Sequence, residues 1–233
     1  MERDFYRLVE ITRDEYDWLV TFIPSEPSEF KRMCFLLLNF SFLSPLHQNA
    51  ETKEIAKSNA LEDAHSTFEK FGKQLISVNN LSDLKAIINL NRAVEPLVFL
   101  SLQYLRTKKV KDRVVKAANF KNTSNINYVK INHLTTFFFS LRLSVGLSVT
   151  GSSHFCLLKS NEGENFITSD QPAINIKDEE LDEEGDIKAF KLYYPLRPTL
   201  ALVVTANQND NHTCEERLIS NKEVRYWNLQ LRE

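Results

Sequence analysis

The chain has 233 residues, which is enough for one large domain or two small ones. Hydrophobic residues (42%) and charged residues (26%) occur at globular levels, and only 5 glycines leave no room for a glycine-rich nucleotide-binding loop. The net charge of −2 predicts no global attraction to nucleic acid or to an anionic membrane, so any such binding needs a local patch.

Three widely spaced cysteines without a CxxC pair predict reduced thiols and a cytoplasmic protein. No apolar run reaches the ~20 residues of a membrane span, and the charged first residues do not resemble a secretory signal. We therefore expect no membrane partner, while the oligomeric state stays open.

Residues 1–150 are predicted to be mainly helical, because apolar residues recur at intervals of three and four. Thr12 or Ser28 is expected to cap an early helix, and Ser82 a later one. The apolar segment 130–147 predicts a buried helix, with a strand as the alternative.

An amphipathic helix is predicted over residues 51–75, with Glu62, His65 and Glu69 on its exposed side. The Glu-x-x-His spacing of Glu62 and His65 also occurs in metal-binding helical bundles. The sequence holds no second Glu-x-x-His to complete such a site, which favours a solvated charged face.

Residues 151–233 are predicted to be β-rich, with a final helix that Ser220 caps and that runs to Glu233, where the chain either ends or continues. Five short segments with period two are the expected strands: 154–159, 165–169, 173–176, 190–194 and 199–205. The acidic segment 178–186 is expected to be a solvated loop. The predicted fold is α+β, one compact unit in which a mainly helical N-terminal half packs on a small, mostly antiparallel sheet.

Gln103, Arg106 and Thr107 are spaced to share one helix face, where a guanidinium, an amide and a hydroxyl could grip a phosphate or carboxylate. The alternative is that Arg106 caps carbonyl groups or pairs with an acid of the sheet. The surrounding window 106–121 is the most basic of the chain, and it could contact a nucleic-acid backbone or form a solvated charged face.

Asp170 lies in Thr168-Ser169-Asp170-Gln171-Pro172, at the end of an expected strand. A carboxylate held there could serve as a general base or a metal ligand, with Ser169 beside it for substrate binding. Ser-Asp-x-Pro is equally typical of a turn in which Asp accepts backbone hydrogen bonds. The sequence lacks four common functional motifs: the Gly-x-Ser-x-Gly of hydrolases, the His-Glu-x-x-His of zinc proteases, the Walker loop of NTPases and the paired cysteines of zinc modules.

Several segments together resemble the domain-of-unknown-function 4238 family. They are Gln103-Tyr-Leu-Arg-Thr107, Phe166-Ile-Thr-Ser-Asp-Gln-Pro172, Tyr194-Pro-Leu-Arg-Pro198, Leu200-Ala-Leu-Val203 and Val224-Arg-Tyr-Trp-Asn228. The matches occur in the family's order, but no counterpart of its opening His-Tyr-Val-Pro-like segment precedes Glu51. The resemblance implies no particular reaction.

We therefore expect an enzyme or effector that acts on a phosphate-containing substrate such as nucleic acid. Asp170 would be the catalytic group, and Gln103, Arg106, Thr107 and Ser169 would bind the substrate. This hypothesis requires Arg106 and Asp170 to converge in space. No metal ligand set is assigned, although a divalent metal would suit Asp170. The alternative is a non-catalytic module that binds a protein or nucleic-acid partner.

Overall fold

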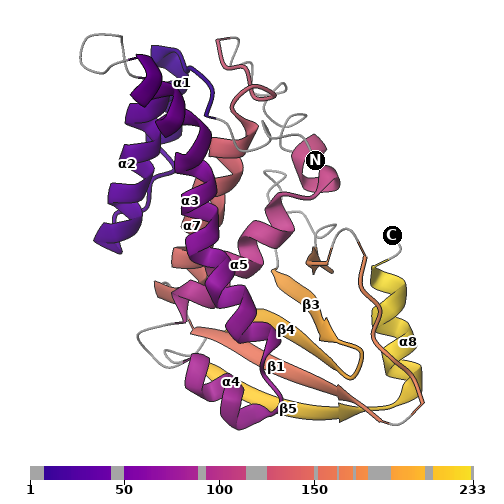
Figure 1. The fold of residues 1–233 in the computed structure, drawn as a ribbon. Coiled ribbons are helices and arrows are strands. Elements are labelled where there is room, and N and C mark those ends of the chain that lie inside the picture. The colour runs from indigo at the N-terminus through magenta and orange to yellow at the C-terminus, as the bar shows by residue number, and fades with distance from the viewer. Residues whose placement is uncertain are drawn as a thin grey trace. The chain divides into compact units, whose positions relative to one another are not determined.

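A computed structural model of the chain describes residues 8–42, 50–88, 93–113, 125–149, 152–161, 163–169, 172–177, 190–207 and 212–231 (Figure 1). The chain divides into unit 1, Met1–Lys70 with Leu105–Val145, and unit 2, Phe71–Tyr104 with Gly146–Glu233. Helices dominate the N-terminal half and a five-stranded sheet lies in the C-terminal half, which confirms the α+β class. Among the described helices, none is long and apolar enough to cross a membrane.

Unit 1 is helical. Its elements are α1 (Arg13–Val20), α2 (Ser28–Phe42), the first part of α3 (Ala50–Ile76) and most of α7 (Asn132–Val149). The ring of Phe68 on α3 lies 5.6 Å from that of Phe30 on α2 and 5.9 Å from that of Phe137 on α7. These buried aromatic rings form the centre of the unit 1 core.

Thr12 caps α1 as the sequence predicts. The Thr12 hydroxyl accepts a hydrogen bond from Glu15 N (3.2 Å), and the Glu15 carboxylate accepts one from Thr12 N (2.8 Å). Glu15 is buried and also accepts hydrogen bonds from Asn127 N (3.3 Å) and Lys130 Nζ (2.5 Å). The same side chain therefore caps α1 and anchors the loop before α7.

Unit 2 contains a mixed sheet of order β2-β3-β4-β1-β5. The strands are β1 (Ser152–Ser160), β2 (Ile174–Asn175), β3 (Lys191–Arg197), β4 (Leu200–Asn207) and β5 (Thr213–Ile219). Every neighbouring pair is antiparallel except β1 and β5, which confirms a mostly antiparallel sheet. Its helices are α4 (Leu81–Ile87), nearly all of α5 (Val94–Leu105) and α8 (Asn221–Gln230), together with the last turns of α3 and α7.

Both faces of the sheet are covered, as two neighbouring tyrosines on β3 show. Tyr193 stacks on Trp227 of α8, with ring centroids 5.0 Å apart, whereas Tyr194 meets Phe99 of α5 edge-on at 5.9 Å. Successive strand residues point to opposite faces, so α8 and α5 cover opposite faces of the sheet (Figure 1). Ser220 caps α8 as predicted, and the Glu223 side chain accepts a hydrogen bond from Ser220 N in return.

Three of the predictions about these helices and strands are wrong. Segment 165–169 is not a strand; Phe166 N donates to Pro198 O (2.7 Å), and the segment joins no ladder. The helix expected after Ser82 is capped by Asn80, whose side chain accepts from Asp83 N. His65 is buried against Phe137 rather than exposed. It lies with Leu61, Ala64 and Phe68 at i, i+3, i+4 and i+7, which places it in the apolar stripe of α3.

Candidate functional site

The predicted substrate-binding residues around α5 occupy different environments. Gln103 is buried within α5, which ends at Leu105, so Arg106 and Thr107 lie beyond the helix instead of on one face with Gln103. Thr107 is buried, and its hydroxyl accepts a hydrogen bond from Val110 N (3.5 Å), which caps the helical segment 108–113. Arg106 is exposed.

The segment that contains Ser169 is held by Asn228 of α8. Ile167 N donates to the Asn228 side chain (3.0 Å), and the Asn228 amide donates to Asn165 O (2.9 Å). Ser169 is half-buried, and Asp170 lies outside the described residues. Asn228 therefore fixes the backbone immediately before the Thr-Ser-Asp stretch, which gives a physical role to the late Asn of the family resemblance.

Arg106 and Thr107 belong to unit 1, whereas Gln103 and Ser169 belong to unit 2. The convergence of Arg106 and Asp170 stays a prediction. The basic window is described only to Arg113, and the acidic segment 178–186 lies outside the described residues.

Two histidines of unit 1 each lie near a cation, His65 near Arg106 and His133 near Lys111. Burial, together with the charges of Arg106 and His133, lowers the pKa of His65 to about 4. Burial and the Lys111 charge also lower the pKa of His133. This group is not evident from the sequence, because its residues come from α3, α7 and the segment between α5 and α7.

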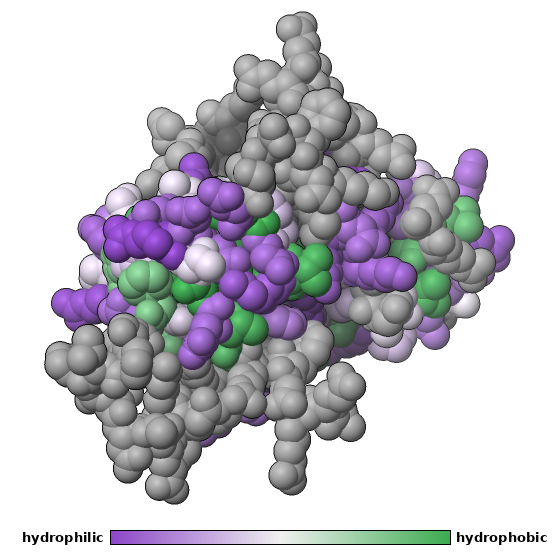
Figure 2. Space-filling model, turned by 90° about the horizontal axis from the view of Figure 1, so that it is seen from above, coloured by the Kyte–Doolittle hydropathy of each residue, from purple (hydrophilic) through white to green (hydrophobic). Residues whose placement is uncertain are grey.

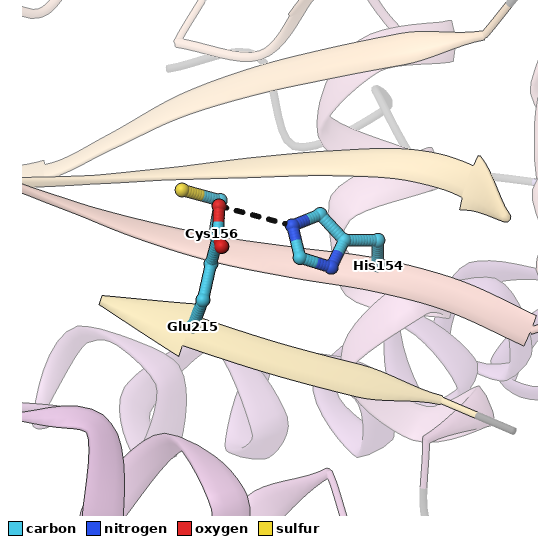
Figure 3. Close-up of side chains that lie close together, drawn as sticks. All are labelled: His154, Cys156 and Glu215. Atoms are coloured by element: carbon cyan, nitrogen blue, oxygen red, sulfur yellow. Dashed lines mark ion pairs between the residues drawn. The ribbon is translucent and has the colours of Figure 1, made fainter. Parts of the chain in front are cut away.

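A second polar group, on β1 and β5 of unit 2, is not evident from the sequence either. His154, Cys156 and Glu215 each offer one ligand atom, and the three atoms all lie within 4.8 Å of one another (Figure 3). Within the described ranges, this is the one group of three or more His, Cys, Asp or Glu residues that could hold a metal ion. Burial, together with a hydrogen bond to Glu215, raises the pKa of the Cys156 thiol to about 12.

The surface of the described residues carries both polar and apolar side chains. On the face drawn in Figure 2, described residues are mainly hydrophilic, with hydrophobic ones interspersed. Large exposed hydrophobic side chains occur in both units: Leu36, Phe42, Ile76, Val129, Ile167, Leu218, Tyr226 and Leu229.

The chain matches one model of a protein family. A family model described as "Protein of unknown function (DUF4238)" matches residues 2–231, which confirms the predicted resemblance and extends it over nearly the whole chain. No curated protein and no solved structure matches the chain.

Proposed function

The chain belongs to the DUF4238 family, and we propose that it binds nucleic acid, as a phosphate-containing substrate, through Arg106 and the cations that follow it. Membership of this family does not by itself assign a reaction. The observation that carries this proposal is the positive environment of the histidine pair. The permanent positive charges that act on His65 and His133 come from Arg106 and Lys111, respectively. An anion placed beside these groups would be stabilised by the same charges.

The residues after Arg106 add further cations to this part of the chain. Lys108 and Lys109 are exposed, Lys111 and Arg113 are half-buried, and Asp112 is the only acid between 106 and 113. A guanidinium can contact two phosphate oxygens at once, while lysines supply mobile point charges. Such contacts are sequence-independent and suit a phosphate backbone better than a single small anion.

Catalysis is assigned in this proposal to Asp170, as an acidic catalytic or metal-binding group of a nuclease. Support comes from the two hydrogen bonds of Asn228, which fix the preceding backbone at Asn165 and Ile167. A catalytic side chain needs such a rigid attachment. Within unit 2, Ser169 and Gln103 are the substrate-binding residues proposed with Asp170.

The binding step can be tested with a fluorescently labelled single-stranded oligonucleotide and anisotropy measurements over a range of salt concentrations. In the double variant Arg106→Gln with Lys108→Gln, we expect weaker binding and a salt slope reduced by about 0.7 for each phosphate contact removed.

A matched control is Lys31→Gln with Arg32→Gln, which removes one exposed lysine and one exposed arginine from α2 of the same unit. This control should bind like the wild type. The proposal is refuted if the wild type does not bind the oligonucleotide, or if both double variants lose the same affinity.

A non-catalytic interaction module is the second candidate. It is favoured by the places of Gln103 and Thr107 in the fold, since one is buried in α5 and the other caps a helical segment. Asp170→Asn distinguishes the candidates in assays of oligonucleotide cleavage with Mg²⁺. A folded variant that binds but does not cleave supports catalysis. If the wild type does not cleave the oligonucleotide and the variant does not fold, the result supports the non-catalytic module.

A further inference from the structure

His154, Cys156 and Glu215 lie together because of the register between β1 and β5. In this parallel pair, Cys156 is opposite Glu215 and His154 is opposite Thr213. Residues two apart on a strand share a face, so all four residues lie on one face of the sheet. Cys156 belongs to the buried cluster beneath Val224 and Trp227 of α8, which identifies this as the face that α8 covers.

In Figure 3 the Glu215 carboxylate lies between the His154 ring and the Cys156 sulfur, and all three ligand atoms lie within 4.8 Å of one another. His154 Nε2 lies 3.2 Å from Glu215 Oε1, and the Cys156 side chain is hydrogen-bonded to the same carboxylate. Zinc in proteins is bound by three kinds of ligand atom, which are an imidazole nitrogen, a thiolate sulfur and a carboxylate oxygen. A buried thiol makes the set softer than the oxygen-only sites that magnesium and calcium prefer.

The second ring nitrogen of His154 has the partner expected of a metal ligand. His154 Nδ1 lies 2.8 Å from Thr213 Oγ1. With Nδ1–H donating to this hydroxyl, Nε2 keeps its lone pair and faces the other two ligand atoms. A metal-binding histidine almost always donates its other N–H to an oxygen in this way, which fixes the ring and its tautomer.

We propose that His154, Cys156 and Glu215 bind one Zn²⁺ ion, with Thr213 positioning the imidazole and a fourth coordination position open to solvent. The open position follows from exposure: His154 is 31% and Glu215 54% exposed, and β5 is the edge strand of the sheet. Three protein ligands with one accessible position are typical of catalytic rather than structural zinc. The site lies wholly within unit 2 and does not depend on the proposed nucleic-acid binding.

On binding, the zinc ion would replace the thiol proton, which passes to solvent while the zinc–sulfur bond forms. The competing explanation is a His–Glu ion pair to which the thiol donates a hydrogen bond. In that arrangement the Cys156 sulfur would not bind a metal ion. A measurement that reports on a metal–sulfur bond therefore distinguishes the zinc site from the ion pair.

The test uses the full chain stripped of metal with a chelator and titrated with Zn²⁺ or with Co²⁺ as a spectroscopic probe. We expect one zinc ion per chain by native mass spectrometry and a thiolate-to-cobalt charge-transfer absorption. Cys156→Ser should abolish that absorption. Cys214→Ser is the matched control, because Cys214 precedes Glu215 on β5 and its side chain lies on the opposite face of the sheet, so the absorption should persist.

Two further variants keep the test decisive if Cys156→Ser does not fold. Glu215→Gln changes an exposed side chain on an edge strand, and Thr213→Val removes the hydroxyl that faces His154. Each should weaken zinc binding by at least about 10-fold, the loss typical of even an outer partner of a metal site. No thiolate absorption in the wild type, an equal absorption in Cys156→Ser, or unchanged affinity in both further variants would overturn the proposal.

Discussion

His65 is a residue whose burial has consequences for stability. It is 7% exposed, its ring lies 5.3 Å from that of Phe137, and the charge of Arg106 disfavours its protonation. A neutral imidazole can share a core with phenylalanines, but an imidazolium there would be poorly solvated. The folded state therefore resists taking up a proton that the unfolded chain accepts readily.

Stability should consequently decrease as the pH is lowered. The pKa of His65 is about 4 in the folded protein, against 6.5 for an unperturbed histidine. Between about pH 4 and pH 6.5 the unfolded state binds more protons than the folded state, so the free energy of unfolding increases with pH in this window. The stability that neutral His65 contributes is lost as the pH falls through the same window. From pH 7 to pH 5 we expect a loss of about 2 kcal/mol from this residue. Urea denaturation at both pH values measures it.

His65→Leu is the comparison for this prediction. Leucine fills a similar apolar position without a titrating group, so the variant should show a smaller loss of stability between pH 7 and pH 5 than the wild type. Other titrating groups, such as the Glu15 carboxylate, contribute equally to both proteins. An identical pH dependence of the two unfolding free energies would show that His65 is not the cause.

At the scale of elements, α3 and α5 approach closely within unit 2 at Gly72. A Cβ atom built there would lie 2.3 Å from Cε2 of Phe99, and that ring is buried. Glycine is required here for the space it leaves rather than for backbone conformation. Gly146 on α7 offers the opposite case, because a Cβ atom there would meet nothing within 4 Å.

These two glycines make a matched pair of alanine substitutions. In Gly72→Ala, overpacking costs about 1–3 kcal/mol, which outweighs a gain in helix propensity of about 1 kcal/mol, so the variant should be less stable. Gly146→Ala should be more stable by about 0.5–1 kcal/mol. Chemical denaturation measures both, and Gly72→Ala combined with Phe99→Leu should recover part of the loss. Equal effects of the two alanines would contradict this account.

Local sequence signals predicted much of the element structure. The Thr12 and Ser220 caps could be found because each forms a capping box with a glutamate three residues later. β5 was missed because its Cys214-Glu-Glu-Arg217 stretch lacks alternation, as suits an edge strand that charges protect from pairing with another chain. Segment 165–169 has a strand-like pattern, but its hydrogen bonds go to Pro198 and Asn228 rather than to a ladder.

The candidate sites were harder to predict because their members are distant in the sequence. His154 and Glu215 are brought together only by the parallel register of β1 and β5, which no local pattern encodes. His65 on α3 and His133 on α7 interact electrostatically, although they are far apart in the sequence. The local prediction that Gln103, Arg106 and Thr107 share a helix failed where α5 ends, at Leu105.

At the scale of the whole molecule, the order of the strands bears on how the chain folds. β1 is flanked in the sheet by β4 and β5, both made later, and Phe155 pairs with Val204 and Cys214. Contacts of such long sequence separation slow folding, because a long loop must close before they form. During synthesis, β1 would leave the ribosome before β4 and β5, so its apolar residues would stay exposed until those two strands were made. A chain cut off before Thr213 would therefore leave one edge of β1 without its partner strand.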